Sequence, residues 1–278
     1  MKESDTLYRE TLRYKISNSK LGRVVMAIAM LPLTPVIDNI DRSRAEYNPV
    51  ELSRQPELDI LTANIHNQPL IQFFNSTFQE QDPLELLDRT KPDIACFQEI
   101  SEEDALSLTS YGDVIFATNN DWVLNGRVGI ALVSTREISG TKTTNLGSDE
   151  YQRPAIIASI DNLKIACLHL TSSTGLAEKE LRKLKDLPHA LDIIMGDLNL
   201  TPAEANSIIG DINYSSRNDE PTHPKTGRAI DRIILLDGSK ILVWKFDSFI
   251  IKINSDHKGV IARIKPSSWT NVDIKELK

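Results

Sequence analysis

The sequence contains little cysteine: two residues in 278, and neither spacing matches a zinc site. Positive charge is also in deficit, because the net charge is −7 and residues 57–278 alone hold 23 Lys and Arg against 32 Asp and Glu. Each phosphate contact to nucleic acid requires a cation, so this balance argues against a broad electrostatic grip on nucleic acid. A local basic groove, or carboxylates gathered around a metal ion, would still fit it.

Long hydrophobic runs are missing as well. The longest apolar core, at 24–33, is shorter than an ordinary membrane span and contains Pro32. Basic residues precede it, as in a signal peptide, but acidic residues are mixed among them and no small-x-small cleavage site follows. Two readings of residues 21–37 therefore stay open. They are a signal or membrane anchor, which implies export or membrane association, or they are a helix packed on the domain of a cytoplasmic protein.

The two cysteines, Cys96 and Cys167, lie in apolar, strand-like runs, "DIACFQE" and "KIACLHL". Free cysteine behaves as a small hydrophobic side chain and is often buried. We therefore expect two buried free thiols rather than a disulfide.

The chain divides into three segments by composition. Residues 1–57 are expected to form an N-terminal extension that ends in a polar, proline-containing linker at 38–57. Residues 58–265 are expected to form one domain, which is a normal size for a single hydrophobic core. Residues 266–278 are expected to be a C-terminal tail.

Short apolar runs separated by turns predict the elements of this domain. Strands are predicted at 58–65, 92–100, 113–118, 129–135, 155–160, 164–170, 192–198, 229–236 and 259–264. Helices are predicted at 82–90, 101–109 and 176–187, the last with leucines on one face and charges elsewhere. This mixture favours a sandwich of sheets covered by helices.

Polar side chains gather at the ends of the predicted strands. They are Asn64, Gln98, Glu99, His169, Asp197, Asn199 and Asp231, and Asp256 and His257 directly precede the last strand. Each has an ordinary explanation when taken alone, because Asn, Asp and Gly form turns and a single histidine can be a satisfied core residue. Strand ends also hold side chains rigidly at one rim of a sheet, where a functional site can be built.

In this order, and within the blocks "KPDIACFQE", "VGIALVS", "LHL", "IIMGDLNLTP", "PTHPKTGRAIDRIIL" and "NSDHKGVIARI", residues 58–265 resemble the endonuclease/exonuclease/phosphatase superfamily. This metal-dependent superfamily includes pancreatic deoxyribonuclease, abasic-site endonucleases, neutral sphingomyelinases and inositol-polyphosphate phosphatases. The resemblance implies an α+β fold, a four-layer α/β/β/α sandwich of two mainly antiparallel sheets, with the site at one rim. It also implies an enzyme, a hydrolase of phosphate esters.

Such a reaction needs a hard divalent cation with oxygen ligands, for which Mg²⁺ is the default and Mn²⁺ also fits. Glu99 is the expected anionic ligand, as the resemblance also implies, and Asn64 and Asp256 are its expected neighbours. Gln98 is expected to support the metal ligand or contact the substrate. Arg153 either faces the substrate phosphate or forms a surface ion pair.

The remaining residues would handle the water and the leaving group. Asp197 is expected to position and deprotonate the attacking water, and Asn199 to hold the water or a phosphate oxygen. His257 would donate to a non-bridging phosphate oxygen, while Asp231 orients its imidazole and favours the protonated form. His169, which the deoxyribonuclease and sphingomyelinase branches share, would help protonate the leaving oxygen.

The match departs from particular branches of the superfamily. Arg232 stands where many members carry an aromatic residue, and the tryptophan-rich stretch of abasic-site enzymes is absent. We expect a phosphodiesterase acting on nucleic acid or phospholipid. The alternatives are a phosphomonoesterase of the same fold, or a non-catalytic member that binds phosphorylated partners. No obligate protein partner is evident.

Overall fold

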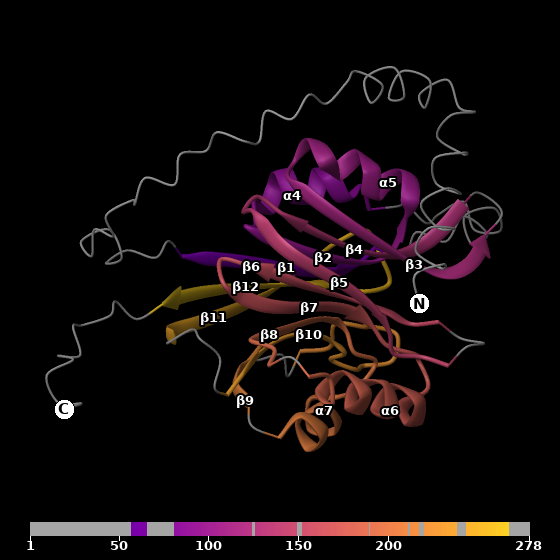
Figure 1. Cartoon of the computed structure of the whole chain (residues 1–278), viewed down its shortest axis with the longest axis vertical. Helices are drawn as coiled ribbons and strands as arrows, with labels where there is room; N and C mark the ends of the chain where they lie inside the picture. The colour runs from indigo at the N-terminus through magenta and orange to yellow at the C-terminus, as the bar shows by residue number, and fades with distance from the viewer. Residues whose placement is uncertain are drawn as a thin grey trace, which may run out of the picture. The chain divides into compact units, whose positions relative to one another are not determined.

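The structure is a computed structural model, and it describes residues 57–65, 81–123, 126–148, 152–188, 190–210, 212–216, 220–237 and 243–266 (Figure 1). All of them belong to one compact unit, Glu51–Lys278. Apart from Glu57, the predicted N-terminal extension, including residues 21–37 with their two alternative roles, lies outside the described residues, as does the tail beyond Pro266. Within the described residues no helix is long and apolar enough to cross a membrane.

Two six-stranded sheets form the centre of this unit. The first sheet has the order β11 (Val243–Ile251), β12 (Gly259–Pro266), β1 (Leu58–Asn64), β2 (Ile94–Ser101), β4 (Gly126–Ser134) and β3 (Asp113–Val123). The second has the order β5 (Ile138–Asn145), β6 (Pro154–Ile160), β7 (Leu163–His169), β8 (Ile193–Asp197), β10 (Asp231–Leu236) and β9 (Ile212–Ser215). Only the pairs β1–β2 and β7–β8 are parallel among these neighbours, so both sheets are mainly antiparallel, as predicted.

Helices cover the outer face of each sheet and complete four layers. Helices α4 (Pro83–Thr90) and α5 (Glu102–Ser107) lie on the first sheet, and α6 (Thr174–Lys185) and α7 (Pro202–Ile209) lie on the second (Figure 1). A 3-10 turn, Leu108–Ser110, follows α5. The predicted α/β/β/α sandwich is therefore confirmed.

Side-chain caps start the short helices. The Asp82 carboxylate accepts from the backbone N–H of Leu84 at 2.8 Å before α4. Thr201 and Glu204 form a reciprocal capping box before α7. Eight-residue helices are too short to be stable by themselves, so packing of their apolar faces on the sheets must hold them.

Strand alternation produces three hydrophobic cores. In β2, Ile94 and Cys96 face the core between the sheets, whereas Ala95 and Phe97 face the core beneath α4 and α5. A third core lies between the second sheet and helices α6 and α7. Because the central strands are buried on both faces, they appear in the sequence as nearly continuous apolar runs, which is why the pattern predicts them.

The elements that the sequence pattern misses are mostly at the sheet edges. Strands β5, β9 and β11 each end a sheet, and most residues of β5, "ISGTKTTN", are exposed. An edge strand packs one face at most and therefore lacks the apolar run of a central strand. Helix α7 is also missed, because it has only two turns between a proline and a glycine.

The expectation of two free thiols is wrong, because Cys96 and Cys167 form a disulfide. The two residues lie in β2 and β7, in different sheets, and both side chains face the core between the sheets. Their Cα atoms are 5.6 Å apart, within the range that a disulfide spans. The bond therefore ties one sheet to the other through the core.

Removing this disulfide is expected to destabilise the fold. It closes a loop of 71 residues, and restricting the unfolded chain in this way typically contributes about 2–4 kcal/mol. We expect the double variant Cys96→Ala, Cys167→Ala to lose that amount of unfolding free energy in urea titrations. Two reactive thiols in the urea-unfolded, non-reduced wild-type protein would contradict the bond.

Candidate functional site

The second sheet places three of the predicted residues in one row across its strands. His169 at the end of β7 pairs with Asp197 at the end of β8, and Asp197 pairs with Asp231 at the start of β10. Met195, two residues before Asp197, packs in the core between the sheets. Because side chains alternate along a strand, Asp197 continues that inner row where the core ends.

The first sheet contributes Asn64 and Glu99 to the same place. Glu99 lies at an irregularity in the β2–β4 pairing and has a φ of 54°, a left-handed conformation that is rare outside glycine. The Asn64 amide donates from Nδ2 to Glu99 Oε1 at 3.1 Å and to Asp197 Oδ2 at 3.2 Å. One fully buried amide therefore links carboxylates from both sheets.

Asp197 is at the centre of the cluster and is almost completely buried. Its Oδ2 accepts from Asn64 and lies 3.6 Å from His169 Nε2 and 3.9 Å from His257 Nδ1. Its Oδ1 accepts from the backbone N–H of Asn199 at 2.9 Å. The carboxylate is thus held in one orientation, with Oδ2 between the two imidazoles.

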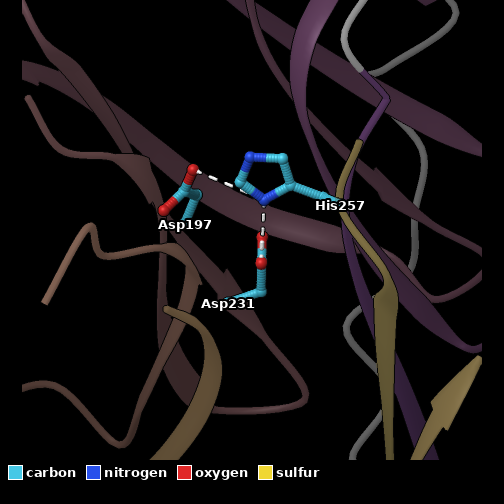
Figure 2. A group of neighbouring side chains, drawn as sticks. All are labelled: Asp197, Asp231 and His257. Carbon is cyan, nitrogen blue, oxygen red and sulfur yellow. Dashed lines mark hydrogen bonds and ion pairs between the residues drawn. The ribbon is translucent and has the colours of Figure 1, made fainter. Parts of the chain in front are cut away.

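Asp231 and His257 form a buried pair. His257 Nδ1 lies 2.9 Å from Asp231 Oδ2, and Figure 2 shows the two side chains meeting beside Asp197. Burial by itself would lower the pKa of His257, but the Asp231 carboxylate outweighs it and raises that pKa to about 9. Burial also raises the pKa of Asp231, with Asp197 adding to the rise. The imidazole is therefore protonated at neutral pH.

The segment that carries His257 is tied to the end of β1. The Ser255 hydroxyl donates to the Asn64 carbonyl at 2.8 Å and accepts from the His257 N–H at 3.2 Å. The next carboxylate, Asp256, has Oδ2 at 3.7 Å from Lys225 Nζ. This serine explains how an aspartate and a histidine that are adjacent in sequence reach a site built by other strands.

At the end of β8 and in the loop that follows, the backbone takes up conformations that require glycine or favour asparagine. A Cβ at Gly196 would lie 1.9 Å from the Leu168 carbonyl oxygen, so only glycine permits β8 to approach β7 this closely. Asn199 has a φ of 50°, and asparagine tolerates the left-handed region. Its Nδ2 donates to the Leu170 carbonyl at 2.8 Å, which fixes the Asn199 amide beside the end of β7.

Gln98 lies inside the sandwich rather than at its rim. It is fully buried, and its Nε2 donates to Thr62 Oγ1 at 3.1 Å and to the Cys96 carbonyl at 2.9 Å. The Gln98 amide therefore forms its hydrogen bonds between the two sheets, and this position does not support a direct contact with substrate. The reason is alternation along β2, because Gln98 is two residues after Cys96 and faces the same side, between the sheets.

Arg153 lies beside the site and is partly buried. Its Nε donates to Thr171 Oγ1 at 3.2 Å, and Thr171 in turn donates to Glu180 at 2.6 Å. The side chain is thus oriented by a hydroxyl rather than by a carboxylate in direct contact. Both of the predicted roles for Arg153, substrate contact or surface ion pair, stay predictions.

Sequence reasoning gave no role to two residues that the structure places at the site. Thr222 is fully buried, and its hydroxyl accepts from the backbone N–H groups of Ile230 and Asp231, at 3.0 Å each. His223 packs edge-on against the His257 ring, with 4.7 Å between ring centroids. Both belong to the block "PTHPKTGRAIDRIIL", so the only available signal was their position shortly before Asp231.

The donor set fits a divalent metal ion. Glu99, Asp197, Asp231 and Asp256 bring four carboxylates to the region around His257, and oxygen donors of this kind suit Mg²⁺ or Mn²⁺. Among the described residues, ligand atoms of Asp197, Asp231 and His257 lie within 4.8 Å of one another and could hold a metal. In this trio, His257 Nδ1 already lies 2.9 Å from Asp231 Oδ2.

Comparison with known proteins identifies the family. The model of the Endonuclease/Exonuclease/phosphatase family matches residues 61–257. No sequence among curated proteins matches the chain.

Solved structures share this fold at low sequence identity. The D. rerio TDP2 structure has a TM-score of 0.57 at 17% identity and covers 76% of this chain and 100% of its own. The endonuclease/exonuclease/phosphatase from Beutenbergia cavernae has a TM-score of 0.56 at 18% identity, over 76% of this chain and 72% of its own. The corresponding protein from Bacteroides vulgatus has a TM-score of 0.56 at 16% identity, over 76% and 100%. The chain belongs to the endonuclease/exonuclease/phosphatase family, whose members are generally phosphoester hydrolases.

Proposed function

We propose that this protein is a divalent-metal-dependent hydrolase of phosphate esters and that it acts on phosphodiesters. The observation that carries the proposal is the position of Asp197, whose Oδ2 is held by Asn64 and lies between His169 and His257. A carboxylate fixed in this way can accept a proton from a water that attacks phosphorus. A merely structural carboxylate would not need imidazoles on either side.

A bound Mg²⁺ or Mn²⁺ would neutralise charge on the phosphate and on the leaving oxygen. Glu99 would hold it, with Asn64 and Asp256 as neighbours. Asn64 then has two functions, because its amide already fixes Glu99 relative to Asp197. One side chain therefore fixes the position of the metal ligand, Glu99, relative to the water-activating group, Asp197.

His257 supplies positive charge on the other side of Asp197. It is protonated because Asp231 holds its Nδ1, so its Nε2–H is available to donate to a non-bridging phosphate oxygen. Charge on that oxygen grows in the transition state, where such a donor is most effective. In this proposal His169 would assist the leaving oxygen, and Asn199 would orient the water.

Two observations bear on the substrate. The D. rerio TDP2 structure, similar in fold, is described in complex with a single strand DNA product, which makes nucleic acid one candidate. The Cys96–Cys167 disulfide favours an oxidising compartment, which supports export or anchoring through residues 21–37 and so an extracellular or phospholipid substrate. A phosphomonoesterase of the same fold would use the same groups.

Turnover of bis-p-nitrophenyl phosphate by the purified chain tests this proposal. We expect hydrolysis with Mg²⁺, loss of hydrolysis in EDTA, and recovery when Mg²⁺ or Mn²⁺ is added in excess. The monoester p-nitrophenyl phosphate should be the poorer substrate. Plasmid DNA, single-stranded DNA, sphingomyelin and phosphoinositides would then separate the substrate classes. Metal-independent turnover, or none on any phosphate ester, would remove the proposed function.

A further inference from the structure

The turn before β10 brings a further imidazole against the site. The His223 ring meets the His257 ring edge to face, with 4.7 Å between centroids and 87° between planes. The His223 side chain keeps 16% of its surface exposed. It therefore contacts the buried pair and is also partly accessible to solvent.

The hydrogen bonds of His223 determine which ring nitrogen carries the proton in the neutral imidazole. The backbone N–H of Thr226 donates to His223 Nδ1 at 3.2 Å. A backbone N–H can only donate, so Nδ1 must carry a lone pair, and in the neutral ring the proton is on Nε2. The local turn thus makes Nε2–H a donor.

This donor lies next to a residue of the site. Nε2 of His223 is 3.9 Å from Asp256 Oδ2, which is longer than a hydrogen bond. The nitrogen is therefore beside Asp256, on a ring that also contacts His257. An acceptor oxygen placed there would be close to the imidazole that we expect to bind the phosphate.

The position of the ring is fixed by the strands that form the site. The carbonyl of His223 accepts from the N–H of Gly227 at 3.0 Å, and Gly227 has the positive φ of 68° that closes the turn. The preceding residue, Thr222, accepts from Lys258 through its carbonyl at 2.7 Å and from Asp231 through its hydroxyl at 3.0 Å. The imidazole is held by the same segments that carry the His257–Asp231 pair.

We propose that His223 is a substrate-binding residue, whose Nε2–H donates to a phosphate oxygen of the ester beside His257. The inference rests on the proposed function and extends it, because it names a second imidazole donor for the same phosphate. The competing role is packing alone, in which the ring only supports His257. The two roles require different atoms: the first needs the Nε2–H, and the second needs the flat ring.

Two variants separate these roles. His223→Phe keeps a ring against His257 but removes the donor, and His223→Gln removes the ring but places an amide N–H near the position of Nε2. Hydrogen bonds to charged groups contribute about 1.5–3 kcal/mol, which corresponds to roughly 10- to 100-fold. For bis-p-nitrophenyl phosphate with Mg²⁺, we expect His223→Phe to lower kcat/KM by at least ~10-fold, mainly through KM, and His223→Gln to retain most of it.

A binding measurement keeps this test independent of turnover. Calorimetric titration with inorganic phosphate in Mg²⁺ should show affinity about tenfold weaker for His223→Phe and nearly unchanged for His223→Gln. If the wild-type chain binds phosphate but hydrolyses no ester, the proposed function fails while this comparison still decides the role of His223. Equal affinity in all three proteins, or weaker binding by the glutamine variant than by the phenylalanine variant, would overturn the inference.

Discussion

Replacing Asp197 with asparagine is expected to reduce phosphodiester hydrolysis by about 10²- to 10⁴-fold, the usual contribution of a general base. The amide nearly preserves the shape of the side chain and can keep its contact with Asn64, but it cannot accept a proton from water. The loss should appear in kcat, since the proton moves in the chemical step. Single-turnover hydrolysis of bis-p-nitrophenyl phosphate with saturating Mg²⁺ measures it.

A matched control lies at the opposite end of the same strand. Asp192 is also buried and accepts a backbone hydrogen bond, from Lys164 at 2.8 Å, just before β8 begins. Asp192→Asn should therefore perturb folding as much as Asp197→Asn, or more, while leaving kcat near the wild-type value. If the two variants lose activity in parallel with their melting temperatures, Asp197 acts through stability and the assigned role is wrong.

The sequence was most informative where strands are buried on both faces. Continuous apolar runs located β1, β2, β7, β8 and β10, and the polar residues at the ends of these runs marked the rim. This works because a strand fixes side-chain direction with a period of two. The order of Asn64, His169, Asp197 and Asp231 in the chain, together with the resemblance to the endonuclease/exonuclease/phosphatase superfamily, then predicted one cluster.

Features that depend on two distant segments could not be predicted in this way. Cys96 and Cys167 are 71 residues apart, and a buried free thiol and a buried half-cystine have the same local pattern. The direction of the Glu99 side chain depends on the irregularity in the β2–β4 pairing, which no composition signal marks. His223 lies in an ordinary turn, and its contact with His257, which lies just before another strand, appears only in the folded structure.

Replacing His257 with glutamine tests the second half of the site. We expect a loss of turnover of about 10²- to 10³-fold with bis-p-nitrophenyl phosphate, because the protonated donor to the phosphate is gone. Folding is also affected, since Asp231 would be left as a buried charge without its partner, a change that typically costs about 3–5 kcal/mol. The double variant His257→Gln, Asp231→Asn should therefore recover stability but not turnover.

The pH dependence of stability gives His257 a readout that does not involve catalysis. In the metal-free protein, which EDTA maintains, folding raises the pKa of His257 from 6.5 to about 9. The folded state therefore binds this proton more tightly than the unfolded state does. The resulting stabilisation, about 3 kcal/mol at most, is fully present below pH 6.5 and is lost as the pH rises through about 9. The raised pKa of Asp231 acts in the same direction.

Urea unfolding of the metal-free protein between pH 6 and 10 should therefore show wild-type stability falling with pH. The double variant His257→Gln, Asp231→Asn should show a flatter stability profile over the same pH range, because neither of the two substituted side chains titrates there. If the wild-type profile is flat as well, the imidazole carries no extra proton in the folded state. In that case His257 could not act as a charged donor to phosphate, and the loss of turnover in His257→Gln would need a purely structural cause.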